Sequence, residues 1–333
     1  MSTADPDTMM NTDNLARAVL EGDRRALARA ITLIESTRRD HRDQAEALME
    51  EFMPHMGGAI RIGISGAPGV GKSTFIEALG LHAIEQGRKV AVLAVDPSSQ
   101  RGGGSILGDK TRMLKLSQSE HAFIRPSPSS GTLGGVARRT REALLACEAA
   151  EFDMAIVETV GVGQSETAVA DMVDMFLLLL LPAAGDDLQG IKKGIMEIAD
   201  LVVVNKADGE LEKVAQRTAG DYANALRMIR PTCPEWTPRV LTCSALEGEG
   251  IMEVWQAIGE FNNLRAESGG IEQRRADQAQ AWMWSEIDEG LRARLHDHKS
   301  VEEMIGGLEA DVAAGKMTPT TAAQKILGVF LGG

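Results

Sequence analysis

The fold of this chain is decided by one stretch, Gly66-Ala67-Pro68-Gly69-Val70-Gly71-Lys72-Ser73, which matches the phosphate-binding pattern G-x-x-x-x-G-K-[ST] in full. Glycines let the backbone wrap around a polyphosphate, so that consecutive N–H groups point at its oxygens. Lys72 places a positive charge on the terminal phosphates, and the Ser73 hydroxyl is a ligand for Mg²⁺. The stretch therefore predicts a nucleoside triphosphate site. The alternative, a glycine turn without a ligand, is disfavoured.

The residues on either side of this loop support the same interpretation. Residues 59–65 contain enough β-branched side chains to form a strand, and Thr74 begins a run that reads as a helix through Leu79. A strand, a glycine loop and a helix in this order place phosphates at a helix N-terminus. We expect an α/β fold with a mostly parallel sheet, in which residues Gly66 to Thr74 contact the nucleotide.

The base is indicated about 130 residues later. Residues 201–204 form a continuous apolar run, typical of a strand buried on both faces of a parallel sheet. The run leads into an N-K-x-D sequence, whose Asn205, Lys206 and Asp208 we assign to the nucleotide site. Asp208 offers acceptors for the N1–H and the 2-amino group of guanine, whereas adenine has neither donor there. Such a buried polar contact discriminates strongly between bases, which favours GTP and GDP over ATP.

A second segment of the base site is expected after the next strand. Residues 239–243 read as that strand, and the triplet that follows is Ser244-Ala245-Leu246. In isolation this triplet carries no information. After a P-loop and an N-K-x-D sequence, it resembles the last guanine-contacting loop of GTPases.

The metal and hydrolysis elements are expected between these two anchors. The sequence Glu158-Thr159-Val160-Gly161 stands where most GTPases have D-x-x-G. Glu158 would hold a Mg²⁺-bound water, and the Gly161 N–H would meet the γ-phosphate. Val162 occupies the position where a glutamine orients the attacking water in Ras-like proteins, and Gln164 is nearby but displaced. We therefore hypothesise slow intrinsic hydrolysis that needs a partner.

A further carboxylate, Asp96, ends the predicted strand 89–95. The segment that follows contains three consecutive glycines, which permit many backbone conformations. A flexible segment beside the phosphates suits a nucleotide-sensing switch, and Asp109 within it is a further candidate metal ligand. The alternative is an ordinary solvent loop.

Together these motifs resemble the MeaB/ArgK/MMAA family of GTPase chaperones of adenosylcobalamin-dependent acyl-CoA mutases. The segments that carry the resemblance are D-P-S-S, G-G-S-I-L-G-D-K-T-R-M, E-T-V-G-V-G-Q-S-E, N-K-A-D and S-A-L. The resemblance implies a P-loop GTPase of the SIMIBI class, which includes the signal-recognition-particle GTPases. It also implies a homodimer that gates adenosylcobalamin delivery to methylmalonyl-CoA mutase and protects that enzyme. The implied catalytic residues are Lys72, Asp96 and Glu158, and the implied Mg²⁺ ligands are Ser73, Asp96, Asp109 and Glu158.

The resemblance also marks the loop from Leu181 to Gly194 as a mobile region that couples to the mutase. Its candidate coupling residues, with Gln164, are Asp186, Asp187, Gln189, Lys192 and Lys193. From physical reasoning alone, the loop follows an apolar strand, residues 175–180, and lies at a carboxyl end of the sheet, where α/β ligand sites are built. The alternative for the two lysines is that they are ordinary solvated charges at the start of a helix.

Composition and charge limit the possible partners. The chain has 333 residues, 25% charged and 44% hydrophobic, which is typical of a globular protein. Its net charge of −13 argues against binding to a nucleic-acid backbone. The longest apolar stretch, residues 175–181, is too short to span a bilayer, and the chain does not open with a secretory signal. Three cysteines without metal-like spacing suit reduced thiols, so we expect a cytoplasmic protein.

We divide the chain into three regions. Residues 1–57 form an N-terminal helical extension of about two helices, whose solvated face carries Arg24, Arg25, Arg38 and Arg39. Residues 58–266 form the GTPase domain. Residues 267–333 form a helical region whose apolar stripe is expected to be buried against a second subunit, as in the family's dimerisation arm. That stripe consists of Trp282, Trp284, Ile287, Leu291 and Leu295.

Two other functions stay open at this point. One is an ATP-driven accessory of amino-acid transport or a P-loop kinase, against which the N-K-x-D sequence argues. The other is a nucleotide-gated scaffold that hydrolyses GTP negligibly, which hydrolysis measurements with and without a mutase would distinguish.

Overall fold

The structure, a computed structural model, describes residues 12–36, 38–95, 113–126, 133–159, 165–182, 193–229 and 233–332. The strands are β1 (Ile60–Gly66), β2 (Val90–Val95), β3 (Ala122–Arg125), β4 (Met154–Thr159), β5 (Met175–Leu180), β6 (Leu201–Val204) and β7 (Arg239–Thr242). The helices are α1 (Thr12–Leu20), α2 (Arg24–Ile34), α3 (Arg39–Phe52), α4 (Lys72–Glu85), α6 (Leu114–Gln118), α7 (Leu133–Ala149), α8 (Ser165–Ala170), α9 (Lys193–Ile198), α10 (Glu212–Leu226), α11 (Ile251–Glu267), α12 (Gly270–His296), α13 (Lys299–Ala313) and α14 (Pro319–Leu331). Two 3₁₀ turns, Met53–His55 and Gly209–Leu211, follow α3 and precede α10.

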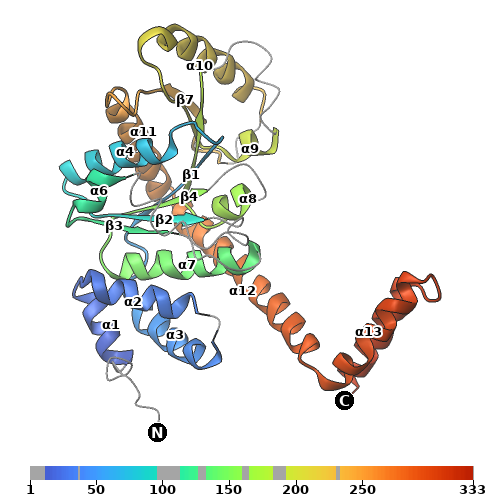
Figure 1. Ribbon diagram of the computed structural model, residues 1–333. Coiled ribbons are helices and arrows are strands. Elements are labelled where there is room, and N and C mark those ends of the chain that lie inside the picture. The colour runs from blue at the N-terminus through green and yellow to red at the C-terminus, as the bar shows by residue number, and fades with distance from the viewer. Residues whose placement is uncertain are drawn as a thin grey trace. The chain divides into compact units, whose positions relative to one another are not determined.

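The strands form one sheet in the order β3-β2-β4-β1-β5-β6-β7, with β1 at its centre (Figure 1). Every pairing among the described strands is parallel, so the predicted α/β fold is confirmed and the sheet is parallel throughout. All residues of β2, β4, β5 and β6 are buried. This burial explains their continuous apolar sequences, because a parallel sheet is covered on both faces.

Helices cover the sheet on both sides. On one face α4, α6 and α11 contribute to a core that includes Phe75, Leu79 and Phe261. On the other face α7 lies between the sheet and the N-terminal helices (Figure 1), and the core continues from Phe176 through α7 to Leu27. The carboxyl ends of the strands therefore belong to a sheet that is packed on both faces.

The N-terminal extension differs from its prediction. Its described residues contain three helices rather than about two, because the turn at Glu21-Gly22 ends α1 and the Asp23 carboxylate caps α2 by accepting from Arg25 N–H at 2.7 Å. Arg24 is also not on a fully solvated face. It is half-buried, and its guanidinium donates to the Ser119 carbonyl at 3.1 Å.

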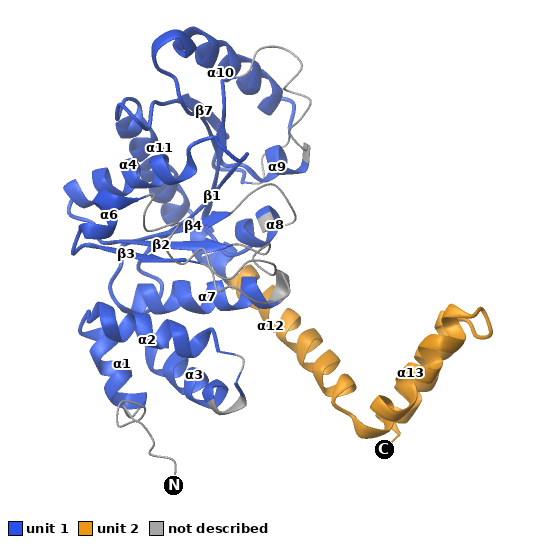
Figure 2. Cartoon of the chain, viewed as in Figure 1, with its two compact units in different colours: residues 1–275 blue, residues 276–333 orange. Residues whose placement is uncertain are grey.

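Contacts divide the chain into two compact units, residues 1–275 and 276–333 (Figure 2). In the first, α11 ends just before Ser268 and Gly269, and α12 begins at Gly270. In the second, α13 packs against α14 and buries Val301, while Trp284 in α12 is 62% exposed. The predicted boundaries at 57 and 266, and the burial of the apolar stripe against a second subunit, stay predictions. No described helix combines the length and the apolar character that crossing a bilayer requires.

Candidate nucleotide site

The P-loop joins the end of β1 to the start of α4. Gly66 is the last residue of β1 and Lys72 the first of α4, whose N-terminus has no side-chain cap. The Lys72 ammonium folds back over the loop and donates to the Gly66 carbonyl at 2.8 Å. Ser73 and Thr74 follow in the first turn of the helix. A helix N-terminus that presents N–H groups beside an ammonium group is suited to bind a phosphate.

Two glycines of the loop are required by close contacts. A Cβ on Gly66 would lie 2.6 Å from the Leu179 carbonyl oxygen in β5. Gly71 has a φ of 92°, and a Cβ there would lie 2.8 Å from Nδ2 of Asn205. The second contact is informative, because it places the N-K-x-D segment directly against the P-loop.

Asn205 joins the P-loop to both base segments. It is 2% exposed, and its Nδ2 donates to the Val70 carbonyl at 2.8 Å. Its Oδ1 accepts from the Ala245 N–H at 3.0 Å and from the Cys243 thiol at 3.4 Å. One amide therefore connects three segments of the predicted site, since its partners lie 135, 40 and 38 positions from Asn205 in the sequence.

The Asp208 carboxylate is oriented by the neighbouring loop. The Ser244 hydroxyl donates to Asp208 Oδ2 at 2.5 Å and itself accepts from the Glu247 N–H at 3.2 Å. The Ala207 N–H donates to the Cys243 carbonyl at 3.0 Å, which ties the two segments together. Lys206 has a φ of 61°, an unusual value for a lysine and consistent with a tight turn at this point. Leu246, the last residue of the predicted triplet, is 77% exposed.

Glu158 lies near the carboxyl end of β4, between β1 and β2, and is 5% exposed. The strand runs to Thr159, so Glu158 is part of the sheet rather than of a following loop. Thr159 Oγ1 donates to Ser65 Oγ at 2.9 Å, with both side chains buried. Sequence reasoning missed this pair, which links the end of β4 to the residue before the P-loop. The only signal was a hydroxyl group within each apolar strand.

Ser73 and Glu158 are the described residues that could hold a metal ion at this edge. Both offer oxygen, which Mg²⁺ prefers, and Mg²⁺ commonly uses one or two protein ligands beside phosphate and water. Within the described ranges, no group of three or more His, Cys, Asp or Glu residues could hold a metal. The oxygen atoms of Ser73 and Glu158 are of the kind that Mg²⁺ prefers as ligands.

The remaining predicted site residues lie outside the described residues, namely Asp96, Asp109, Gly161, Gln164, Asp186, Asp187, Gln189 and Lys192. Lys193 begins α9, but its side chain is outside the description. The segments concerned follow Val95, Thr159 and Pro182, at or just after the carboxyl ends of β2, β4 and β5. These ends share the sheet edge that carries the P-loop, and the roles of the residues beyond them stay predictions.

Comparison with known proteins gives consistent matches. A family model described as methylmalonyl-CoA mutase-associated GTPase MeaB matches residues 27–300. A probable GTPase of Mycobacterium tuberculosis is 54% identical over 325 residues, which cover 98% of this chain and 96% of the relative. The mouse methylmalonic aciduria type A homolog is 48% identical (96% and 79% covered), and GTPase ArgK of Escherichia coli is 47% identical (96% and 97% covered). A crystal structure titled LAO/AO transport system kinase is 39% identical, with a TM-score of 0.77 over 99% of this chain and 100% of that one.

Proposed function

The chain belongs to the MeaB family of methylmalonyl-CoA mutase-associated GTPases, and from that premise we propose that it hydrolyses GTP to gate adenosylcobalamin loading into a methylmalonyl-CoA mutase and to protect that enzyme. GTPase activity is the common property of the family. The observation that carries the proposal is the Asn205 amide, which bonds the P-loop at Val70 and the base segment at Ala245. This arrangement fixes the proposed phosphate site and the proposed guanine site relative to each other.

In this site the backbone from Gly66 to Thr74 holds the phosphates, and the Lys72 ammonium neutralises charge on the β- and γ-phosphoryl oxygens. Asp208 accepts from the N1–H and 2-amino groups of guanine, while the Ser244 hydroxyl fixes the orientation of its carboxylate. Ala245 and Leu246 complete the base site. GTP and water give GDP and phosphate.

Mg²⁺ is the metal that we assign to this site. Ser73 and Glu158 would hold it with the nucleotide, and Asp96 and Asp109 are the further ligands that we propose. When bound, the ion neutralises charge that develops on the transferred phosphoryl group. Glu158 is buried in β4, so its carboxylate is held in place by the sheet rather than by a mobile loop.

We further propose that the mutase completes the hydrolytic site. Val162 cannot orient a water, so a partner must supply that function or bring Gln164 into place. The loop with Asp186, Asp187, Gln189, Lys192 and Lys193 would communicate with the mutase. We also propose a homodimer formed through residues 267–333 and a cytoplasmic location, the latter supported by three buried cysteines that are free of disulfides.

An accessory role in amino-acid transport is the second candidate. It is favoured by one observation, the 39% identity over nearly the whole chain to a structure titled as a transport system kinase. That role with ATP would require a base site that accepts adenine, which offers Asp208 no donor at N1.

Single-turnover hydrolysis with a purified methylmalonyl-CoA mutase tests the proposal. We expect the mutase to stimulate GTP hydrolysis at least tenfold, which is about 1.4 kcal/mol of barrier.

Asp208→Asn should lose affinity for GTP and gain affinity for xanthosine triphosphate, because its amide donates to the carbonyl that xanthine carries in place of the 2-amino group. Asp221→Asn, an exposed carboxylate of α10, is the matched control and should keep GTP. Comparable ATP binding by the parent would favour the transport role. GTP hydrolysis that stays negligible with the mutase present would favour the nucleotide-gated scaffold.

A further inference from the structure

Helix α8 begins at Ser165, directly after the segment that contains Gly161, Val162 and Gln164. In the proposed function this segment meets the γ-phosphate and the attacking water, so α8 provides one of its two ends. The helix has six residues, and a helix this short is not stable by its own backbone bonds. Its position therefore depends on the segments that it contacts.

One of these contacts is a close approach to the central strand of the sheet. Val169 of α8 is buried, and a Cβ on Gly63 of β1 would lie 2.8 Å from its Cγ1 atom. The side chains of Val173 and Phe176 would lie 3.0 and 3.1 Å from the same Cβ. Because Gly63 has no side chain, α8 and the turn after it pack directly on the strand that leads into the P-loop.

The C-terminal end of α8 is also held by an arginine from the first turns of α12. Arg274 Nη2 donates to the Ala170 carbonyl at 3.1 Å, and Arg274 Nε donates to the Val173 carbonyl at 2.9 Å. Ala170 is the last residue of α8, and the last carbonyls of a helix have no partner within the helix. Both nitrogens belong to one planar guanidinium, so the two bonds fix the helix end and the following turn together.

Arg274 also acts on a buried carboxylate. Asp200 directly precedes β6, is 1% exposed, and accepts from the Phe176 N–H at 2.8 Å. Burial raises the pKa of Asp200, and the positive charge of Arg274 acts in the opposite direction. Loss of this arginine would therefore affect both the α8 carbonyls and the charge balance at Asp200. A lysine at the same position separates the two effects, because it keeps the charge but lacks the planar pair of donors.

We propose that Arg274 is a positioning residue for GTP hydrolysis and acts through α8. It fixes the helix that follows the hydrolytic segment, while Thr159 in β4 fixes the residue before that segment. A misplacement of about 1 Å far from the chemistry can cost about 100-fold in rate, so the anchor of α8 should affect turnover. The inference rests on the proposed function, because the part that residues 160–164 play in hydrolysis belongs to that proposal.

Steady-state GTP hydrolysis by the full chain, with and without the mutase, tests this inference. We expect Arg274→Ala to lower kcat at least fivefold and to leave the KM for GTP within twofold. The reason is that Ala170 and Val173, which Arg274 bonds, are not among the residues assigned to the nucleotide. Arg274→Lys should keep kcat at least threefold below that of the parent, and it replaces the alanine variant if that variant does not fold.

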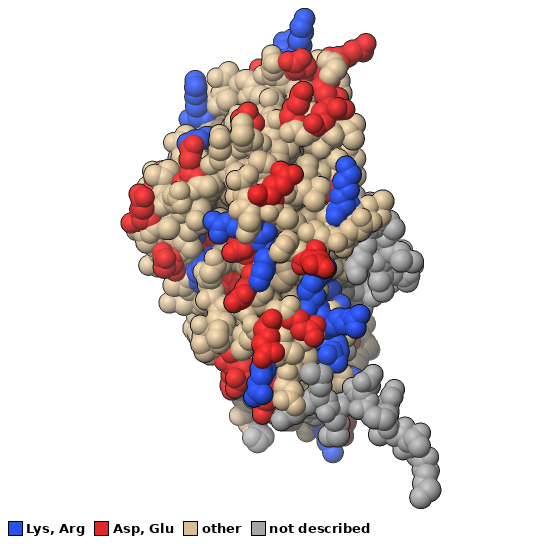
Figure 3. All heavy atoms as spheres, turned by 90° about the vertical axis from the view of Figure 1, so that its left-hand side faces the viewer, with Lys and Arg blue, Asp and Glu red and all other residues tan. Residues whose placement is uncertain are grey.

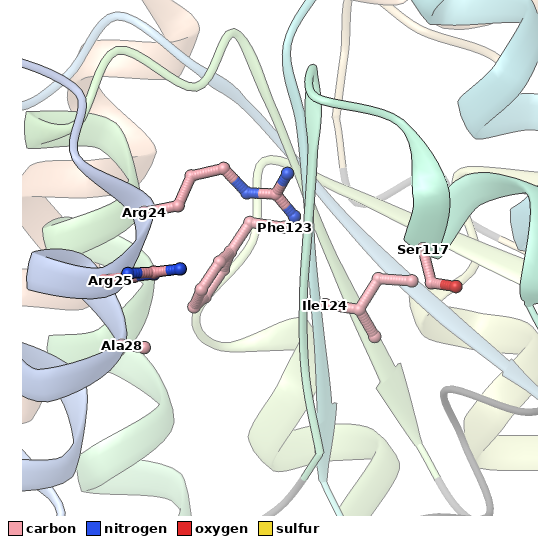
Figure 4. A pocket seen from close by; sticks show the side chains of 6 residues that line it. All are labelled: Arg24, Arg25, Ala28, Ser117, Phe123 and Ile124. Carbon is pink, nitrogen blue, oxygen red and sulfur yellow. The ribbon is translucent and has the colours of Figure 1, made fainter.

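The matched control is Arg25→Ala, which removes the same charge from α2. Arg25 is exposed and lines a groove of about 500 Å³ beside β3 (Figure 4). On this side of the molecule acidic and basic side chains are interspersed (Figure 3), so the loss of one charge should change the local field little. We expect kcat and KM of Arg25→Ala to stay within twofold of the parental values.

Hydrogen exchange of the GDP-bound chain, measured by mass spectrometry, reports on α8 without hydrolysis. Amides of residues 167–173 should exchange at least tenfold faster in Arg274→Ala than in the parent, and those of β5 should be unchanged. The inference is overturned by parental kcat in Arg274→Ala, by full recovery of kcat in Arg274→Lys, or by parental exchange of residues 167–173. A parent that hydrolyses no GTP even with the mutase would contradict the proposed function itself, whereas unchanged exchange in Arg274→Ala would contradict this inference alone.

Discussion

Replacing Asn205 by alanine tests whether the phosphate and base segments form one unit. The side chain donates to the Val70 carbonyl at 2.8 Å and accepts from the Ala245 N–H at 3.0 Å. Alanine would leave a buried carbonyl and a buried N–H unpaired. Each such group costs about 1–3 kcal/mol, so the two together cost about 2–6 kcal/mol.

This cost should appear in both folding and binding. We expect the free energy of unfolding of nucleotide-free Asn205→Ala, measured by urea denaturation, to fall by about 2 kcal/mol or more. The Kd for a fluorescent GDP analogue should rise at least tenfold, because both unpaired groups belong to segments that we assign to the nucleotide. Asn205→Asp keeps an acceptor for Ala245 but turns an oxygen toward the Val70 carbonyl, so it should be equally harmful.

The matched control is Asn263→Ala, an exposed asparagine of α11, which should change stability by no more than about 0.5 kcal/mol. If Asn205→Ala had the parental urea midpoint and the parental Kd for GDP, the bridging role of Asn205 would be wrong. A loss of stability without a loss of affinity would mean that Asn205 only supports folding.

Two other predictions concern stability, the first away from the nucleotide site and the second at Cys243, which contacts Asn205. Arg275→Ala removes the 2.6 Å ion pair with Asp174, which is 1% exposed, and should lower the free energy of unfolding by about 3–5 kcal/mol in urea denaturation; a change within about 0.5 kcal/mol would contradict this. Burial raises the pKa of the Cys243 thiol from 9.0 to about 12, so its contribution to stability is fully present below pH 9 and is lost as the pH rises toward 12. Thermal melts across this pH range should therefore fall less steeply for Cys243→Ala than for the parent, and parallel profiles would refute the assignment.

The sequence predicted best those parts of the site that are local. The P-loop and the N-K-x-D segment are each contiguous, and each follows a strand whose apolar run could be recognised alone.

Contacts between distant segments were not predictable from one sequence. Nothing near Thr159 indicates that its hydroxyl would meet Ser65, 94 positions away. Arg24 was expected on a solvated face because helical spacing shows only which side of its own helix a residue occupies, and not which other segment lies there. Its partner, the Ser119 carbonyl, is 95 positions distant.

In our proposal, nucleotide binding and hydrolysis depend on different parts of the structure. The groups assigned to binding are connected by hydrogen bonds from buried Asn205 to Val70 and from buried Ser244 to Asp208. Catalysis in our proposal needs more, because the orientation of the attacking water depends on segments beyond the carboxyl ends of β2, β4 and β5. A partner that acts on those segments would change the rate of hydrolysis while leaving the guanine contacts unchanged. The Thr159–Ser65 hydrogen bond joins the two parts, since it ties the strand carrying Glu158 to the residue that precedes the P-loop.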